Sequence, residues 1–230
     1  MEKISRRELL TKTGMVAGLT AGAMLGGRLF VPHAQAKTAP EKIPYPLHPL
    51  DAEKSRKMAY GKFKKSWCTV GTFHAVIGQL AEKYGTPYDT FPVGMIAYGN
   101  GGMYGFGSVC GALNGAAIAI HLLLGEDDKQ TKEAKAAVHE LFRWYEQEKL
   151  PLFTPAKANF KEGGVGQSVA KSILCQDSKV NWSKASGFKI GSKQFLERCG
   201  RLTADVAGKT AEIINAIEAG NFKAVYSAKQ

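Results

Sequence analysis

Apolar residues recur at every third or fourth position along most of this chain, and such spacing predicts helices. The first helical segment follows Asp51, a residue type that favours helix N-termini, and it ends before Gly85 and Pro87. The residues that mark its repeat are Phe63, Trp67, Val70, His74, Ile77 and Tyr84. The strict alternation of apolar and polar residues that indicates strands is hard to find.

The same spacing predicts further helices over residues 108–125, 127–149, 168–184 and 192–219. The third helix of the chain is amphipathic, and the last one is closed by Gly220. Residues 150–167 hold prolines and a cluster of glycines, so we expect a loop there. The sequence therefore predicts a single all-α domain of about five to seven helices over residues 51–230.

The N-terminal residues look like an export signal. Residues 5–10 read Ser-Arg-Arg-Glu-Leu-Leu, residues 14–27 form an uncharged run of small and apolar side chains, and residues 34–36 read Ala-Gln-Ala. The arginine pair resembles a twin-arginine signal peptide, which exports proteins that are already folded. An ordinary secretory signal or a membrane anchor is the alternative, although the run is shorter than the ~20 residues of a membrane-spanning helix. We expect cleavage after Ala36, a periplasmic or exported protein, and no membrane attachment afterwards.

Between this signal and the domain, residues 37–50 carry four prolines and are predicted to form an extended leader. The formal net charge is +11, and it falls to +8 when the five basic and two acidic residues of the signal are removed. Basic proteins commonly bind nucleic acid, but an exported protein does not meet it. We therefore expect a solvated basic surface and no nucleic-acid partner, with attraction of an acidic redox partner as the alternative.

Four cysteines lie on four different segments: Cys68, Cys110, Cys175 and Cys199. No C-x-x-C pair occurs, so neither a thioredoxin-type dithiol nor a zinc ribbon fits, and no C-x-x-C-H occurs, so covalent c-type haem is not expected. Cys110 lies near a predicted helix start, where the positive end of the helix dipole favours a thiolate. Two disulfides, a four-thiolate iron–sulfur or zinc centre, and free thiols all stay open at this point.

Other chemical signals are weak. The segment GNGGMYGFG, residues 99–107, misses the pattern G-x-G-x-x-G because Tyr104 takes the place of the last glycine. The sequence contains no P-loop and no G-x-S-x-G, so no hydrolase or phosphotransfer motif is present. We expect His121 in the core or an interface, and we expect the tryptophans to be core anchors, namely Trp67, Trp144 and Trp182. Whether the chain is an enzyme stays open, with an electron carrier favoured over a catalyst.

Three stretches carry a family resemblance. CGALNGA starts at Cys110, SILCQDSKVNWSKASG covers residues 172–187, and ERCGRLTADVA covers residues 197–207, while Cys68 lies alone upstream. Together they resemble the family named for its C…GCAxxG…C…C pattern, in particular the split-Soret cytochrome c branch. The similarity extends over about residues 67–215.

The resemblance implies a helical, often dimeric redox protein in which Cys68, Cys110, Cys175 and Cys199 hold an iron–sulfur centre of [2Fe-2S] type. The branch also carries c-type haems, for which this sequence has no attachment motif. The expectation is an exported electron-transfer protein with an unidentified redox partner protein and, by resemblance, a homodimeric state. The alternatives are a disulfide-stapled helical binding or structural module and a structural four-thiolate zinc protein.

Overall fold

The structure, a computed structural model, describes residues 43–224. The predicted signal peptide and its cleavage site lie outside the described residues. The helices are α2 (Ala52–Tyr84), α3 (Gly111–Leu124), α4 (Asp128–Gln147), α5 (Cys175–Ser186) and α6 (Lys193–Glu218), with a 3-10 helix η1 (Val93–Gly99). Strands β1 (Lys149–Leu150) and β2 (Ser168–Val169) form a small antiparallel pair. The all-α fold class is confirmed.

Local capping explains why several helix ends fall where the sequence predicts them. The Asp51 carboxylate accepts the backbone N–H of Lys54 at the start of α2, and the Ser192 hydroxyl accepts that of Phe195 at the start of α6. Two helices begin later than predicted: α3 starts at Gly111 rather than at residue 108, and α5 at Cys175 rather than at residue 168. In both cases the residues before the helix pair with another segment of chain, as described below.

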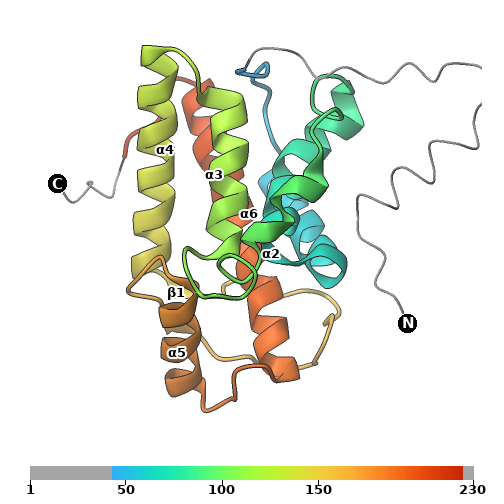
Figure 1. The fold of residues 1–230 in the computed structure, drawn as a ribbon, viewed down its shortest axis with the longest axis vertical. Helices are drawn as coiled ribbons and strands as arrows, with labels where there is room; N and C mark the ends of the chain where they lie inside the picture. The colour runs from blue at the N-terminus through green and yellow to red at the C-terminus, as the bar shows by residue number, and fades with distance from the viewer. Residues whose placement is uncertain (1–42, 225–230) are drawn as a thin grey trace, which may run out of the picture. The chain divides into compact units, whose positions relative to one another are not determined.

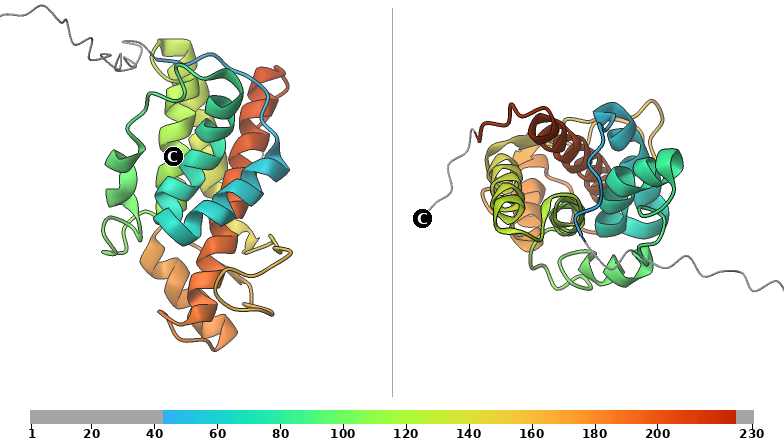
Figure 2. Two further views of the ribbon diagram at one scale, coloured as in Figure 1. Left: turned by 90° about the vertical axis from the view of Figure 1, so that its right-hand side faces the viewer. Right: turned by 90° about the horizontal axis from the view of Figure 1, so that it is seen from above.

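Helices α2, α3, α4 and the C-terminal part of α6 lie side by side as a bundle (Figures 1 and 2). Helix α3 contacts α2, α4 and α6, and its uncharged sequence is buried along most of its length. Helix α5 and the N-terminal part of α6 lie at one end of the bundle (Figure 1). The described part of the leader packs on this bundle, because Tyr45 and Leu50 are buried and the Tyr45 N–H donates to the Leu122 carbonyl at 2.7 Å.

One expectation about large side chains is wrong. Trp144 and Trp182 are buried as predicted, but Trp67 is 47% exposed because the backbone leaves the helical conformation at this residue and turns its side chain off the core face. His121 is exposed on the last turn of α3, so of its two expected positions the core is contradicted and an interface stays a prediction.

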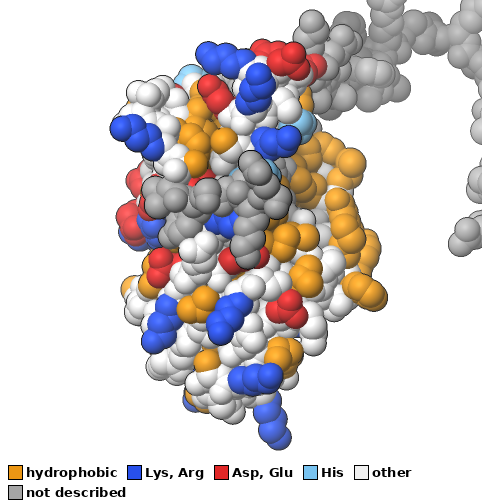
Figure 3. All heavy atoms as spheres, turned by 90° about the vertical axis from the view of Figure 1, so that its left-hand side faces the viewer, with side chains coloured by type: hydrophobic (Ala, Val, Ile, Leu, Met, Phe, Trp, Pro, Cys, Tyr) orange, Lys and Arg blue, Asp and Glu red, His pale blue; other side chains and the backbone are white. Residues whose placement is uncertain are grey.

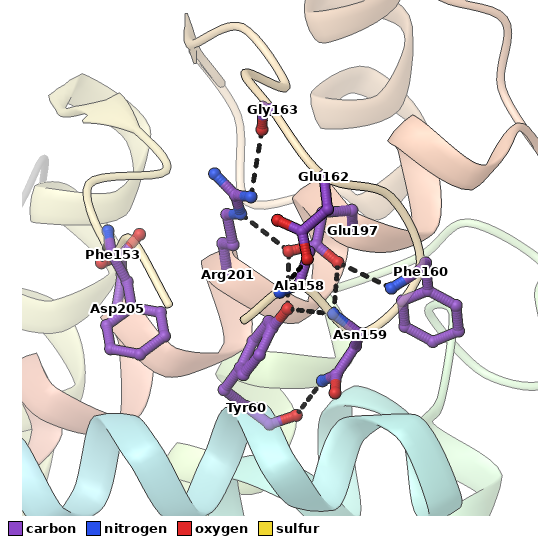
Figure 4. Close-up of polar contacts among 10 residues, drawn as sticks. All are labelled: Tyr60, Phe153, Ala158, Asn159, Phe160, Glu162, Gly163, Glu197, Arg201 and Asp205. Carbon is purple, nitrogen blue, oxygen red and sulfur yellow. Dashed lines mark hydrogen bonds and ion pairs between the residues drawn. The ribbon is translucent and has the colours of Figure 1, made fainter. Parts of the chain in front are cut away.

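The loop between β1 and β2 is held by two buried carboxylates of α6 (Figure 4). Glu197 accepts the backbone N–H groups of Asn159 and Phe160, together with the Tyr60 hydroxyl at 2.6 Å. Asp205 accepts the backbone N–H groups of Leu152 and Phe153. This loop therefore has fixed hydrogen-bond partners on α6, although it contains little regular secondary structure.

The surface carries both signs of charge. Figure 3 shows Lys and Arg side chains interspersed with Asp and Glu over the face that carries α4. Hydrophobic side chains gather along the edge that carries η1 and the loop after it, where the exposed residues are Met95, Tyr98, Met103, Tyr104 and Phe106 (Figure 3). Within residues 43–224, no helix has the length and apolar character needed to cross a bilayer.

Candidate metal centre

A break inside α2 places the first cysteine. Trp67 has φ 63° and ψ −168°, so the helical hydrogen bonding stops there and Cys68 begins a second helical run. A positive φ is rare for a residue with a bulky side chain, and such strain is commonly found at functional sites. Cys68 thereby lies at a new helix N-terminus, which is the positive end of the helix dipole.

Asn100 stabilises this break from the loop after η1. Its side-chain oxygen accepts the Thr69 N–H at 2.9 Å, and its amide nitrogen donates to the Ser66 carbonyl at 3.3 Å. One side chain thus satisfies both a carbonyl before the break and an N–H after it. The next residue, Gly101, donates its backbone N–H to Cys68 Sγ at 3.5 Å, which is a hydrogen bond that favours a sulfur carrying negative charge.

Cys110 and Cys175 are brought together by a short backbone pairing. The Cys110 N–H donates to the Ile173 carbonyl at 2.9 Å, and the Cys175 N–H donates to the Ser108 carbonyl at 2.7 Å. Val109 and Leu174 form the bridge between these segments. Because each segment leads directly into a helix, Cys110 is the N-cap of α3 and Cys175 is the first residue of α5.

Cys199 comes from α6, and polar side chains surround it. The neighbouring Arg198 places Nη1 3.9 Å from Cys199 Sγ, and its Nη2 donates to Ser178 Oγ at 2.7 Å. The buried Tyr145 donates its hydroxyl to the same Ser178 Oγ at 2.9 Å and lies in contact with Cys110. A chain of polar contacts from α4, α5 and α6 therefore connects two of the cysteines.

All four cysteines line one cavity of about 600 Å³. None forms a disulfide: Cys110 is buried, and Cys68, Cys175 and Cys199 are half-buried. Across residues 43–224, no three side chains of His, Cys, Asp or Glu are close enough to hold a single metal ion. The cysteines thus line a cavity whose volume is many times the ~30 Å³ that one water molecule occupies in the liquid. Exposed Trp67, Tyr104 and Ile190 also line it.

A larger cavity, of about 930 Å³, lies beside residues 152–157 and α6. Its lining includes no cysteine, and its buried carboxylate, Asp205, is already bonded to two backbone N–H groups. Size alone would favour this cavity, but the residues with metal-binding chemistry lie in the smaller one, and the candidate site is therefore placed there.

Burial makes ionisation of Cys68, Cys175 and Cys199 unfavourable in the absence of a cation. It raises the pKa of Cys68 to about 12, and the proximity of Cys110 contributes in the same direction. Burial also raises the pKa of Cys175 and of Cys199, and at Cys199 the charge of Arg198 opposes the rise. Mutual repulsion among these sulfurs follows from their convergence on one cavity. A metal cation bound in the cavity would instead favour the thiolate forms, since metal coordination deprotonates thiols.

Gly111 leaves room for the sulfur of Cys68. A Cβ atom at this position would collide with Cys68 Sγ and would come within 2.8 Å of both the Gly99 carbonyl oxygen and Thr69 Oγ1. The helix that carries Cys110 can therefore approach the second run of α2 only with glycine here.

The sequence identified all four cysteines, and the structure brings them to one cavity. The sequence did not identify Asn100, Tyr145 or Arg198. Asn100 lies in the glycine-rich segment already noted, and Arg198 directly precedes a cysteine in ERCGRLTADVA, but neither position alone indicates burial or contact with a thiol.

Four thiols that converge on a cavity in a helical fold are typical of a redox protein with a metal centre. The model of a family of proposed redox-active proteins named C_GCAxxG_C_C matches residues 72–213, and this chain belongs to that family. Split-Soret cytochrome c from Desulfovibrio desulfuricans is 38% identical over 224 residues, which cover 92% of this chain and 78% of that relative.

A solved structure of split-Soret cytochrome c from the same organism is described as having a novel iron centre. It matches with a TM-score of 0.75 and 40% sequence identity, over 80% of this chain and 77% of that one. The predicted family resemblance is confirmed, and this chain is a redox-family protein related to an iron-containing protein.

Proposed function

We propose that this chain is an exported one-electron carrier in which Cys68, Cys110, Cys175 and Cys199 hold an iron–sulfur centre of [2Fe-2S] type. The observation that carries the proposal is the convergence of four free thiols on one cavity. Four cysteine thiolates are the usual ligands of such a cluster. The relative's iron centre supports iron as the metal.

The surroundings of the thiols fit a group with negative charge. Cys68, Cys110 and Cys175 all lie at helix N-termini, where the positive ends of the helix dipoles stabilise thiolates. Gly101 supplies a backbone N–H to Cys68, and Arg198 supplies a buried positive charge beside Cys199.

When bound, the centre would supply one-electron chemistry. The chain's own residues would bury it, fix its ligands and keep bulk water from most of its surface. An electron would enter from a donor protein and leave to an acceptor protein, with no bond in the chain made or broken. The exposed residues of the cavity lining, Trp67, Tyr104 and Ile190, mark the side on which such exchange would take place.

The export signal, cleavage after Ala36 and a periplasmic location complete the proposal. Loading the centre in the cytoplasm before export would suit a twin-arginine signal, because such signals export folded proteins. A homodimer and an unidentified redox partner protein are part of the same proposal.

Iron and acid-labile sulfide analysis, with anaerobic absorption and electron paramagnetic resonance spectroscopy, tests the assignment. We expect visible absorption, a reducible paramagnetic signal, and two irons and two sulfides per chain for a [2Fe-2S] centre. Thiol titration of the denatured, metal-free protein should find all four thiols. A protein with no titratable thiols would be a disulfide-stapled module, and a colourless one holding zinc would be a structural zinc protein.

Cys110→Ser should remove the iron, the sulfide and the visible absorption, because the hydroxyl of serine is a poorer ligand for iron than a thiolate. Ala119→Ser is the control, since it introduces a serine at a buried position of α3 that does not line the cavity. Retention of full iron and colour in Cys110→Ser would contradict the ligand assignment.

A further inference from the structure

Arg198 is a buried positive charge that lines the four-cysteine cavity. Its side chain is only 2% exposed. The guanidinium donates to Ser178 Oγ, lies over the Trp182 ring at 6.0 Å, and approaches Cys199 Sγ at 3.9 Å. Its Nε–H has no hydrogen-bond partner. An arginine with an unused buried donor beside thiols points to an acceptor that belongs in this cavity.

Within the described helix α6, the carboxylates near Arg198 form no hydrogen bond or ion pair with it and are bonded to other groups. Glu197, the preceding residue, bonds to Arg201 at 2.8 Å and to the loop after β1. Asp205 lies about two turns further along α6. It interacts electrostatically with Arg198, but its oxygens are bonded to the backbone of Leu152 and Phe153 rather than to the guanidinium. Among the residues that the structure describes, no Asp or Glu lies within ion-pair distance of Arg198. Burying an unpaired guanidinium is costly, so its counter-charge is expected to come from the occupant of the cavity.

We propose that Arg198 is the internal counter-charge of the centre and a hydrogen-bond donor to its sulfur atoms, and that it raises the reduction potential. This inference rests on the proposed function. A [2Fe-2S] core with four thiolates is an anion that becomes more negative when one electron is added. A fixed positive charge in a poorly solvated site stabilises the reduced form more than the oxidised form, and hydrogen bonds to sulfur act in the same direction.

Ser178 and Tyr145 are positioning residues for this arginine. Ser178 Oγ accepts hydrogen bonds from both the Tyr145 hydroxyl and Arg198 Nη2, which fixes the guanidinium against the cavity wall. The Trp182 indole, which is fully buried, covers the guanidinium from one side. Lysine has neither the planar fork nor the length to make the same contacts.

The test compares the holo forms of wild type, Arg198→Lys, Arg198→Met and Lys209→Met. Lys209 is the matched control, because it is also a cation on α6, lies 5.9 Å from the Trp144 ring centroid and does not line the cysteine cavity. Redox titration should give a more negative midpoint potential for Arg198→Met, an intermediate value for Arg198→Lys, and a value close to wild type for Lys209→Met. The iron–sulfur stretching bands in resonance Raman spectra should also shift on exchange into D₂O, less so in Arg198→Met.

If Arg198→Met does not retain iron, Arg198→Gln decides, because it removes the charge and keeps a side-chain amide donor. A wild-type potential in Arg198→Gln would overturn the inference, as would equal potentials for Arg198→Met and Lys209→Met. These results are distinct from failure of the proposed function, which would appear as an absence of iron and sulfide in the wild-type protein.

Discussion

At the residue scale, the site depends on one position that has to be glycine. Gly111 directly follows Cys110, and the space that its Cβ would fill is occupied by Cys68 Sγ. Because Gly111 has no side chain, the thiols of Cys68 and Cys110 can both line the same cavity.

We expect Gly111→Ala to reduce iron retention and to lower the free energy of unfolding by about 2 kcal/mol, because the added methyl group forces the backbones of α2 and α3 apart. Iron content and urea unfolding measure the two effects. The control is Gly61→Ala in α2, where nothing lies within 4 Å of the new Cβ, and where alanine should stabilise the helix by about 0.5–1 kcal/mol. Equal iron retention and equal stability in the two variants would contradict this account of Gly111.

At the element scale, α6 contacts two different parts of the molecule. Cys199 and Leu202 line the cysteine cavity, while Glu197 and Asp205 hold the loop between β1 and β2. The pKa of Glu197 is lowered, since hydrogen bonds from Tyr60 and Arg201 outweigh the opposing effect of burial. Burial prevails at Asp205 and raises its pKa to about 6, even though two backbone N–H groups favour its charged form.

The Asp205 carboxyl thus holds its proton more tightly in the folded chain than in the unfolded one. Between about pH 4 and pH 6 the folded state binds more protons than the unfolded state, so the contribution of this group to stability falls as pH rises through this window. We expect Asp205→Asn to remove this pH-dependent loss in the free energy of unfolding, which amounts to at most about 3 kcal/mol in the wild type. Urea unfolding at pH 4 and pH 7.5 measures this loss as the change in the free energy of unfolding between the two pH values, compared between wild type and variant. An identical pH dependence in both proteins would show that Asp205 does not titrate in this range.

Sequence predicts the elements of this fold better than it predicts the break that matters for the site. The starts of α2 and α6 follow from Asp51 and Ser192, because an N-cap acts within three residues. The break at Trp67 depends on Asn100, which is 31 positions from its partner Thr69, so helical periodicity continued through it. The burial of Arg198 depends on side chains from α4 and α5 in the same way. The convergence of the cysteines was implied by the family resemblance and was left open by their spacing.

At the scale of the whole molecule, the four cysteines come from four helices. A centre bound to all of them would connect α2, α3, α5 and α6 through bonds that the polypeptide alone does not provide. Because metal that binds only the folded state adds its binding free energy to folding, the centre would stabilise the entire arrangement.

Removal of iron with a chelator and a reductant should therefore lower Tm by several degrees, measured by circular dichroism at 222 nm. The same treatment should leave the Tm of Cys110→Ser unchanged, since that variant is expected to hold no iron at the start. Equal Tm values for the iron-loaded and iron-depleted wild type would mean that the centre does not bridge the helices.

The packing of α6 against α2, two helices far apart in the sequence, has a consequence for biosynthesis. Cys68 and Cys110 leave the ribosome before Arg198 and Cys199 do. The cavity cannot close until α6 has left the ribosomal tunnel and docked. Iron delivered before that moment would meet separate thiols on an incompletely folded chain, so cofactor insertion is expected to follow the emergence of α6.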